Sequence, residues 1–107
     1  WEVVDFKSGR PSDDPAVDLQ LDAYAVAATA GALGPAPERL SVTFAHLGGG
    51  LTERTAEVTP ERLESARARL AAVVDGIDAA VWTPTPGDHC RGCDFLTVCE
   101  AGRAAVG

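Results

Sequence analysis

The stretch Val3-Val4-Asp5-Phe6-Lys7-Ser8-Gly9 decides how the rest of the chain is interpreted. An apolar run leads into a carboxylate and an ammonium group two residues apart, and a turn of small residues follows. Because alternate residues of a β-strand share a face, Asp5 and Lys7 are expected to point the same way. Val4 and Phe6 are then expected to be buried in the opposite layer. Such a strand carries either an exposed ion pair, which contributes little stability, or a metal-and-acid site.

The composition indicates one small domain with a single modest core. The chain has 107 residues and a formal net charge of −7, and this charge argues against a self-sufficient nucleic-acid clamp, because phosphate binding depends on Lys and Arg. It does not exclude a catalytic module whose grip on DNA comes from other domains. The sequence shows neither a transmembrane segment nor a signal peptide, so we expect a cytoplasmic protein without membrane contact. Since it lacks Met and opens on Trp1 in a strand-like run, we expect it to be part of a longer protein.

The first strand is followed by the signals of a helix. Asp14 is the expected N-cap and Pro15 the first helical residue, and the helix is predicted over about 16–29 with Gly31 as its stop. Its buried face is expected to consist of Val17, Leu21, Tyr24 and Ala28. Gln20 and Tyr24 are four residues apart and therefore lie on the same side.

A hairpin and a second helix are predicted next. Residues 40–47 alternate as a strand, the glycines at 48–50 indicate a turn, and 51–58 reads as a more polar strand near a sheet edge. The inward face of the first of these strands is expected to hold Leu40, Val42, Phe44 and His46. Thr59 caps a helix that begins with Pro60. Its buried stripe is expected to be Leu63, Ala66, Leu70, Val73 and Ile77, and its solvated face Glu61, Glu64, Arg67 and Arg69. The predicted order is β-α-β-β-α, an α/β fold over residues 1–82.

The last part of the chain, residues 83–107, is a cysteine-rich tail. Cys90 and Cys93 are separated by two residues, and Cys99 follows at the expected start of a short final helix. Three cysteines crowded into one segment do not suggest a secreted disulfide framework and in a reducing compartment more often bind metal. A structural metal usually takes four ligands, so His89 is one candidate fourth ligand of a zinc site. The alternatives are a cluster ligand outside this chain, as an iron–sulfur centre with four cysteines needs, or three reduced cysteines without metal.

Two elements occur together: Asp5-Phe6-Lys7 on a strand, then Gln20-Leu21-Asp22-Ala23-Tyr24 on the next helix. This pairing resembles the RecB-like branch of the PD-(D/E)XK nuclease superfamily. The cysteine spacing of the tail is similar to that of its iron–sulfur variant, found in helicase–nucleases of the AddB and AdnB type. The resemblance extends from Trp1 to about residue 101. It implies a partial restriction-endonuclease-like core, and an upstream Asp, an upstream His and the first cluster cysteine are not among these residues.

The resemblance also implies roles for particular residues. Asp5 and the backbone carbonyl of Phe6 are implied ligands of Mg²⁺ or Mn²⁺, and Lys7 is implied to polarise the scissile phosphate or orient water. Gln20 and Tyr24 are implied to border the site and hold Lys7 or DNA. In the tail, Cys90, Cys93 and Cys99 are implied to be three of the four ligands of a [4Fe–4S] cluster.

The expected function is therefore a DNA exonuclease domain of a bacterial ATP-dependent helicase–nuclease that acts in double-strand-break repair. Because one carboxylate provides few of the ligands that Mg²⁺ usually needs, we expect this chain alone to be inactive. Expected partners are DNA, a partner helicase–nuclease subunit and, through an exposed sheet edge, a second copy of the chain. The alternatives are a non-catalytic module that binds DNA or a partner subunit, and a small zinc-binding structural domain. Neither His46 nor His89 is assigned a catalytic role.

Overall fold

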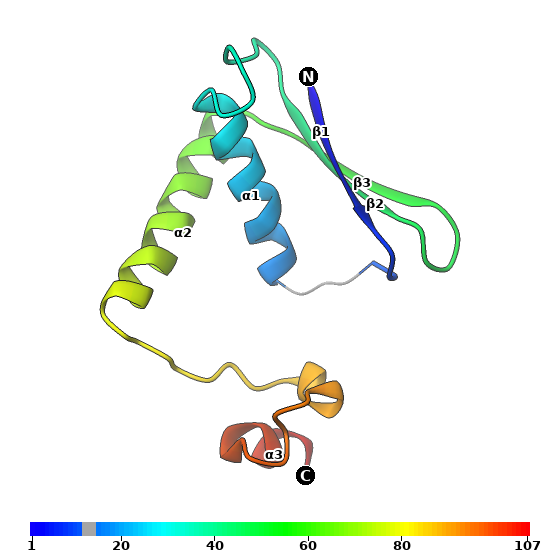
Figure 1. Ribbon diagram of the computed structural model, residues 1–107, viewed down its shortest axis with the longest axis vertical. Coiled ribbons are helices and arrows are strands. Elements are labelled where there is room, and N and C mark those ends of the chain that lie inside the picture. The colour runs from blue at the N-terminus through cyan, green and yellow to red at the C-terminus, as the bar shows by residue number, and fades with distance from the viewer. Residues whose placement is uncertain (12–14) are drawn as a thin grey trace. The chain divides into compact units, whose positions relative to one another are not determined.

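A computed structural model describes residues 1–11 and 15–107, apart from the side chains of 15–17 (Figure 1). The elements in chain order are β1 (Glu2–Lys7), α1 (Pro15–Thr29), β2 (Ser41–His46), β3 (Thr52–Glu57), α2 (Pro60–Asp78), the 3₁₀ helix η1 (Asp88–Gly92) and α3 (Glu100–Val106). The predicted α/β class and the order β-α-β-β-α are confirmed. The chain divides into two compact units, Trp1–Asp75 and Gly76–Gly107. Within the described ranges, no helix has the length and apolarity that crossing a membrane requires.

The first unit is built on a three-stranded sheet in the order β1-β2-β3. β1 runs parallel to β2, with Asp5 opposite Phe44 and Lys7 opposite His46, and α1 supplies the crossover that a parallel pair needs. β2 and β3 are antiparallel, and the glycines between them form the predicted turn. Gly49 and Gly50 have φ angles of 76° and 103°, a region that side chains other than glycine rarely adopt.

The ends of β1 and β2 are fastened together next to Lys7. The Leu47 amide donates to the Lys7 carbonyl at 2.8 Å, and the Gly48 amide donates to the Gly9 carbonyl at 3.2 Å. A Cβ atom on Gly48 would lie 2.8 Å from the carbonyl oxygen of Ser8, so only glycine permits this approach. The backbone that carries Lys7 is therefore held from the neighbouring strand.

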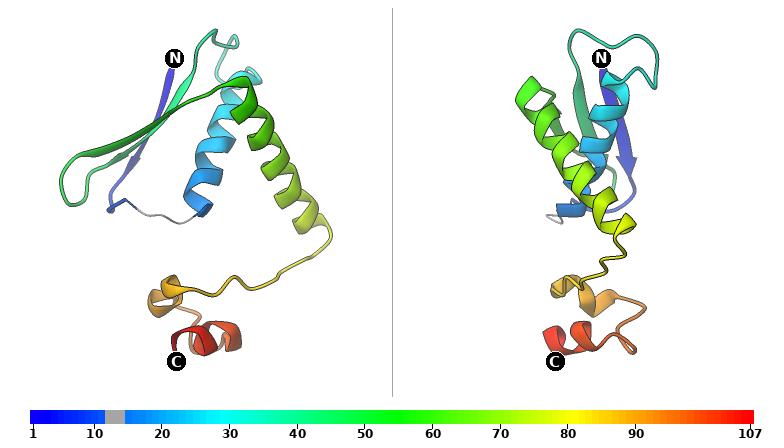
Figure 2. Two further views of the ribbon diagram at one scale, coloured as in Figure 1. Left: turned by 180° about the vertical axis from the view of Figure 1, so that it is seen from behind. Right: turned by 90° about the vertical axis from the view of Figure 1, so that its left-hand side faces the viewer.

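α1 covers one face of the sheet and forms the core of the unit (Figure 2). Leu21 and Ala25 pack against Val42 and Phe44, and all four side chains are buried. Ala28, Leu40 and His46 are also buried, as predicted. Gly31, with a φ angle of 86°, follows the end of α1 as expected. The predicted N-cap Asp14 lies outside the described residues, and the side chain of Val17 is likewise not described.

The predicted burial of Val4 and Phe6 is wrong. Val4 is 39% exposed and Phe6 is 69% exposed, whereas Val3, Asp5 and Lys7 on the other face of β1 are half-buried. The reason is that α1 packs on the face that carries Asp5 and Lys7, and no described element of this unit covers the opposite face. The side of the strand with the charged residues is thus the sheltered one.

α2 begins as predicted but is buried only in part. The Thr59 hydroxyl accepts a hydrogen bond from the Arg62 amide at 3.1 Å, which confirms the cap. Ala66 is buried and Leu63 and Leu70 are half-buried. The rest of the predicted stripe is wrong, because Val73 and Ile77 are 42% and 53% exposed.

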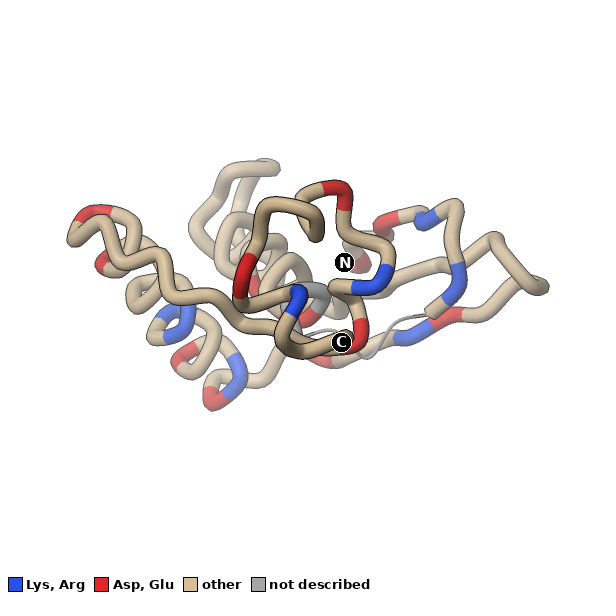
Figure 3. Tube along the Cα trace, turned by 90° about the horizontal axis from the view of Figure 1, so that it is seen from below, with Lys and Arg blue, Asp and Glu red and all other residues tan. Residues whose placement is uncertain are grey.

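α1 and α2 are joined by a buried carboxylate. Asp22 is fully buried, and its Oδ2 accepts hydrogen bonds from Arg69, with Nε at 2.7 Å and the nearer terminal nitrogen at 2.6 Å. A terminal nitrogen of Arg62 lies 3.6 Å from Oδ1. Removing a carboxylate from water costs several kcal/mol unless a cation and hydrogen bonds offset it. Arg69 is therefore not the purely solvated residue that the charge pattern of α2 indicated, although this helix carries both acidic and basic residues along its length (Figure 3).

Replacing Arg69 by Ala should lower the free energy of unfolding by about 2–3 kcal/mol, because it leaves the buried Asp22 carboxylate with one distant cation. Arg67→Ala on the same helix is the matched control and should change it by less than about 0.5 kcal/mol. Urea unfolding followed by circular dichroism measures both. Equal effects of the two variants would contradict this role of Arg69.

Candidate active site

Four side chains from β1 and α1 form a closed ring of polar contacts. The Lys7 ammonium donates to Gln20 Oε1 at 2.7 Å, and the Gln20 amide donates to the Tyr24 hydroxyl at 3.0 Å. The Tyr24 hydroxyl donates to Asp5 Oδ2 at 2.8 Å. The ring closes where Lys7 Nζ lies 2.9 Å from the same Asp5 oxygen. The structure thus brings together the four side chains that the sequence selected.

The donor and acceptor roles in this ring are fixed by its chemistry. An ammonium only donates, so Gln20 must present its carbonyl oxygen to Lys7 and its amide hydrogens to Tyr24. Tyr24 accepts from Gln20 and has its own proton left for Asp5, which as a carboxylate only accepts. The four side chains therefore match one another as donors and acceptors, and the ring places the Lys7 ammonium beside the Asp5 carboxylate.

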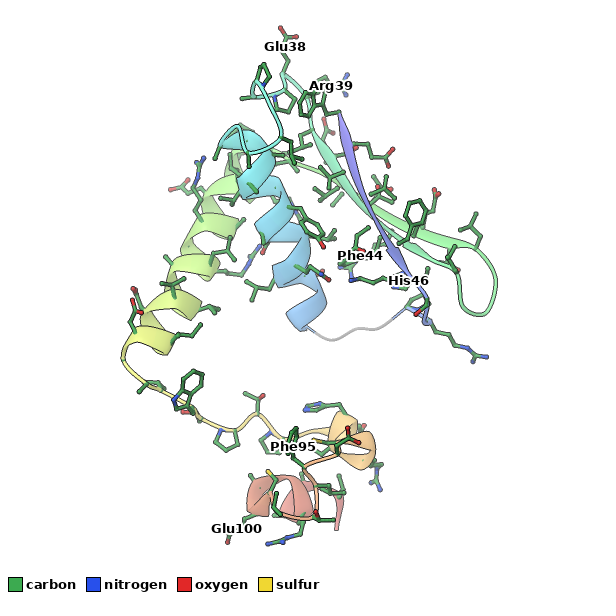
Figure 4. All side chains as sticks on the ribbon, viewed as in Figure 1. Glu38, Arg39, Phe44, His46, Phe95 and Glu100 are labelled. Carbon is green, nitrogen blue, oxygen red and sulfur yellow. The ribbon has the colours of Figure 1, made fainter. Side chains whose placement is uncertain are left out.

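The ring is sheltered without being sealed. The Asp5 and Lys7 side chains are 17% and 32% exposed, so a substrate group can reach both. Lys7 Nζ lies 5.1 Å from the centre of the Phe44 ring, within reach of a cation–π attraction. The Phe44 ring in turn contacts His46 edge-on at 5.9 Å, and both project from the lower half of β2 on the side of α1 (Figure 4).

The ring shifts the pKa values of two of its members in opposite directions. The hydrogen bond from Lys7, followed by that from Tyr24, lowers the pKa of the Asp5 carboxyl, although partial burial opposes this change. The hydrogen bond to Asp5, with burial, raises the pKa of the Tyr24 hydroxyl. Asp5 is therefore an anion and Tyr24 a neutral donor throughout the neutral pH range.

The backbone carbonyl of Phe6 points away from β2. The carbonyls of Trp1 and Lys7 both accept bonds from the β2 segment, and in a parallel pair alternate residues bond to the same neighbour. Carbonyls of even-numbered residues of β1 therefore face its outer edge, where the described residues place no strand. The Phe6 carbonyl is an oxygen donor beside the Asp5 carboxylate on this strand.

These two oxygens are of the kind that a hard divalent cation binds. Mg²⁺ prefers oxygen ligands and is commonly held by one or two carboxylates together with water and substrate phosphates. The lowered pKa of Asp5 keeps this ligand ionised. Across the described ranges, no three His, Cys, Asp or Glu residues are grouped to hold a metal ion, so these two oxygens could hold a cation only together with water, substrate or further ligands.

The cysteines of the second unit do not form a metal centre as they lie. Cys90 is buried in η1, Cys93 is exposed, and Cys99 is half-buried. The Cys99 sulfur accepts a hydrogen bond from the Gly102 amide at 3.3 Å and so caps α3, which confirms its expected place at the start of the last helix. Because no three metal-binding residues of the described part converge, the cysteines form neither an iron–sulfur site nor a zinc site in this conformation, with or without the exposed His89.

The polar cluster of Asp22 with Arg62 and Arg69 was not predicted from the sequence. Asp22 lies between Gln20 and Tyr24 in the sequence, and the motif assigned it no role. An Asp one residue from the apolar Leu21 on a largely buried helix was the available signal that it needs a cationic partner. His46 is buried, and its Nδ1 has no hydrogen-bond partner among the described residues.

Comparison with known protein families matches residues 1–100 to the PD-(D/E)XK nuclease superfamily. The chain belongs to this superfamily. The match spans the ring and the three cysteines, and members of the superfamily are generally nucleases that use divalent metal ions. No curated protein and no solved structure matches the chain.

Lys7→Met should raise the pKa of Asp5, and Tyr24→Phe should raise it less, because the bond from Lys7 is the larger cause of the lowered value. A carbon-13 NMR titration of the Asp5 carboxyl measures both, and Arg39→Met, which removes a cation from the exposed pair with Glu57, is the control. Since the folded pKa lies below the unfolded value near 3.8, the stabilisation is complete above that pH and is lost as the pH falls through the folded pKa. An unchanged Asp5 pKa in Lys7→Met would contradict the ring.

Proposed function

We propose that this domain is the catalytic part of a metal-dependent DNA nuclease in which Asp5 and the Phe6 carbonyl hold Mg²⁺ or Mn²⁺ and Lys7 contacts the scissile phosphate. The observation that carries this proposal is the closed ring, which fixes a charged Lys7 beside an ionised Asp5. An exposed ion pair would need neither Gln20 nor Tyr24 to orient it. The superfamily membership supports the reaction class.

The side chains divide the work of phosphodiester hydrolysis. A bound divalent cation supplies an activated water and offsets charge on the phosphate. The ring uses two of the three donors of the Lys7 ammonium, which leaves one donor for a phosphate oxygen as negative charge develops there. Gln20 and Tyr24 hold Lys7 and Asp5 in register, so they position these groups without touching the reacting atoms.

The partial metal site has a consequence for activity. One carboxylate and one carbonyl leave most of an octahedral Mg²⁺ shell to water and substrate. We therefore propose that a further carboxylate from outside the described residues completes the site and that the 107-residue chain alone is inactive.

The proposed setting is the RecB-like branch, as part of a bacterial ATP-dependent DNA helicase–nuclease that processes double-strand breaks. The order of the motifs supports this: Asp5 and Lys7 on β1, Gln20 and Tyr24 on α1, then the cysteine tail. A partner subunit or a second copy of the chain is proposed to pair with the outer edge of β1, which is unpaired in the described residues. Size-exclusion chromatography separates a monomer from such a dimer.

We also propose that Cys90, Cys93 and Cys99 are three ligands of a [4Fe–4S] cluster, with zinc as the alternative. The support is their spacing, since two thiolates three positions apart and a third nearby are typical of such centres. The turn around Cys93 must rearrange for the three sulfurs to meet, and a fourth ligand must come from elsewhere.

The chain alone should not cleave DNA in the presence of Mg²⁺. In a longer polypeptide that adds a carboxylate near Asp5, Lys7→Ala should lower kcat at least about 100-fold, because a donor to the developing charge is lost. Release of labelled nucleotides from linear DNA measures both, with Arg39→Ala as the control. Cleavage by the chain alone that Lys7→Ala abolishes would contradict the partial site, and unchanged cleavage by the longer Lys7→Ala variant would contradict the proposed role of Lys7.

If the tail holds a cluster, anaerobically purified protein should contain iron and absorb in the visible range, and Cys93→Ser should remove both properties. Elemental analysis and the absorption spectrum are the measurements. One zinc per chain without visible absorption would support the alternative, and absence of both metals would contradict a metal centre in the tail.

A further inference from the structure

A cleft lies on the flank of α1 that faces away from the ring. Residues two positions apart in an α-helix are about 200° apart around its axis, so Asp18 and Gln20 face different sides. The cleft has a volume of about 580 Å³ and is lined by Asp18 and Leu19 of α1, by Arg54 of β3 and by Arg62, Arg69, Ala72 and Val73 of α2. All of these residues belong to the first unit, Trp1–Asp75.

The cleft is positively charged in a chain that is strongly acidic overall. Three of the nine Lys and Arg residues line it. The acidic groups that bind these arginines are Asp18 and Asp22, so one positive charge is left over. A terminal nitrogen of Arg54 lies 2.7 Å from Asp18 Oδ1, and this pair fixes the direction of its guanidinium.

Arg62 is the arginine with unused hydrogen-bonding capacity. Its Nε is buried without a hydrogen-bond partner among the described residues, and the same is true of Asp22 Oδ1. The 3.6 Å between Arg62 and this oxygen is too long for a hydrogen bond. Arg69 meanwhile satisfies Asp22 at Oδ2. Arg62 thus lies near a buried carboxylate without forming a hydrogen bond to it, and its side chain is 29% exposed.

The remaining walls of the cleft are apolar. Leu19, Ala72 and the 42%-exposed Val73 line it beside the arginines, and its volume is in the range of sites for small organic ligands. The planar guanidinium of Arg matches phosphate oxygens in pairs, and an apolar wall suits a sugar or base. The cleft therefore offers arginines for the phosphate of a nucleotide and an apolar wall for its sugar or base.

We propose that this cleft binds one nucleotide of a single nucleic-acid strand, with its phosphate on Arg62 and Arg54 and its sugar and base against Leu19 and Val73. The proposal rests on the proposed function in taking nucleic acid as the substrate. It assigns the cleft to holding the strand away from the ring, on residues that make no contact with Asp5 or Lys7 in the described structure.

The test measures binding without metal. In EDTA at low ionic strength, fluorescein-labelled (dT)8 should bind the chain, and Arg62→Gln should weaken binding about tenfold or more, because a charged donor to phosphate is lost. Arg67→Gln removes the same charge from the exposed face of α2 and should weaken it less than threefold. Arg62→Gln keeps the Arg69–Asp22 bonds, and circular dichroism confirms that the variant is folded.

Two further readouts make the result decisive. Unlabelled dTMP should shift the amide NMR signals of Leu19, Ala72 and Val73, and (dT)8 should bind more tightly than dTMP if the ligand is a strand. Equal loss in Arg62→Gln and Arg67→Gln, no binding at all, or dTMP binding at least as tightly as (dT)8 would each overturn the proposal. Metal-dependent cleavage is a separate readout that depends on Lys7, so failure of the cleft and failure of the proposed nuclease site can be told apart.

Discussion

The contact on which the site depends is the bond between the Lys7 ammonium and Gln20 Oε1. Without it, Lys7 is one member of a part-exposed ion pair, and such pairs contribute little. With it, the ammonium is tied to α1, Gln20 is oriented toward Tyr24, and the Tyr24 hydroxyl donates a hydrogen bond to Asp5. One bond between helix and strand therefore converts a common surface pair into a preorganised set of charges, which is the form that electrostatic catalysis requires.

The fold supplies the conditions for that bond. α1 packs on the face of the sheet that carries Asp5 and Lys7, through Leu21 and Ala25 against Val42 and Phe44. The neighbouring strand holds the Lys7 backbone, and the Asp22 pairs join α1 to α2. The flank of α1 nearest β1 thus contributes Gln20 and Tyr24 to the ring, and the other flank faces the cleft, whose arginines lie on β3 and α2. Both polar sites depend on one helix with an apolar seam between them.

The sequence predicted the element order, because strand and helix signals are local. β-strand alternation and helical spacing place Asp5 with Lys7 and Gln20 with Tyr24, whereas the expectation that these two pairs belong to one site came only from the family resemblance. It failed where burial depends on which face another element covers. Val4 and Phe6 carry apolar side chains but lie on the uncovered face, and no local rule shows this. Arg69 was read as solvated because its partner Asp22 is 47 residues away in the chain. The meeting of the cysteines also depends on long-range packing, which spacing alone does not determine.

We propose that the ring presents Asp5 and the Phe6 carbonyl to a divalent cation. Titration of the nitrogen-15-labelled chain with substoichiometric Mn²⁺ tests it directly, because the paramagnetic ion broadens amide signals according to their distance from it. We expect that the signals of Asp5, Phe6 and Lys7 broaden first and that Asp5→Asn removes this effect, whereas Glu57→Gln on β3 leaves it unchanged. Broadening that begins elsewhere, or that persists in Asp5→Asn, would contradict it.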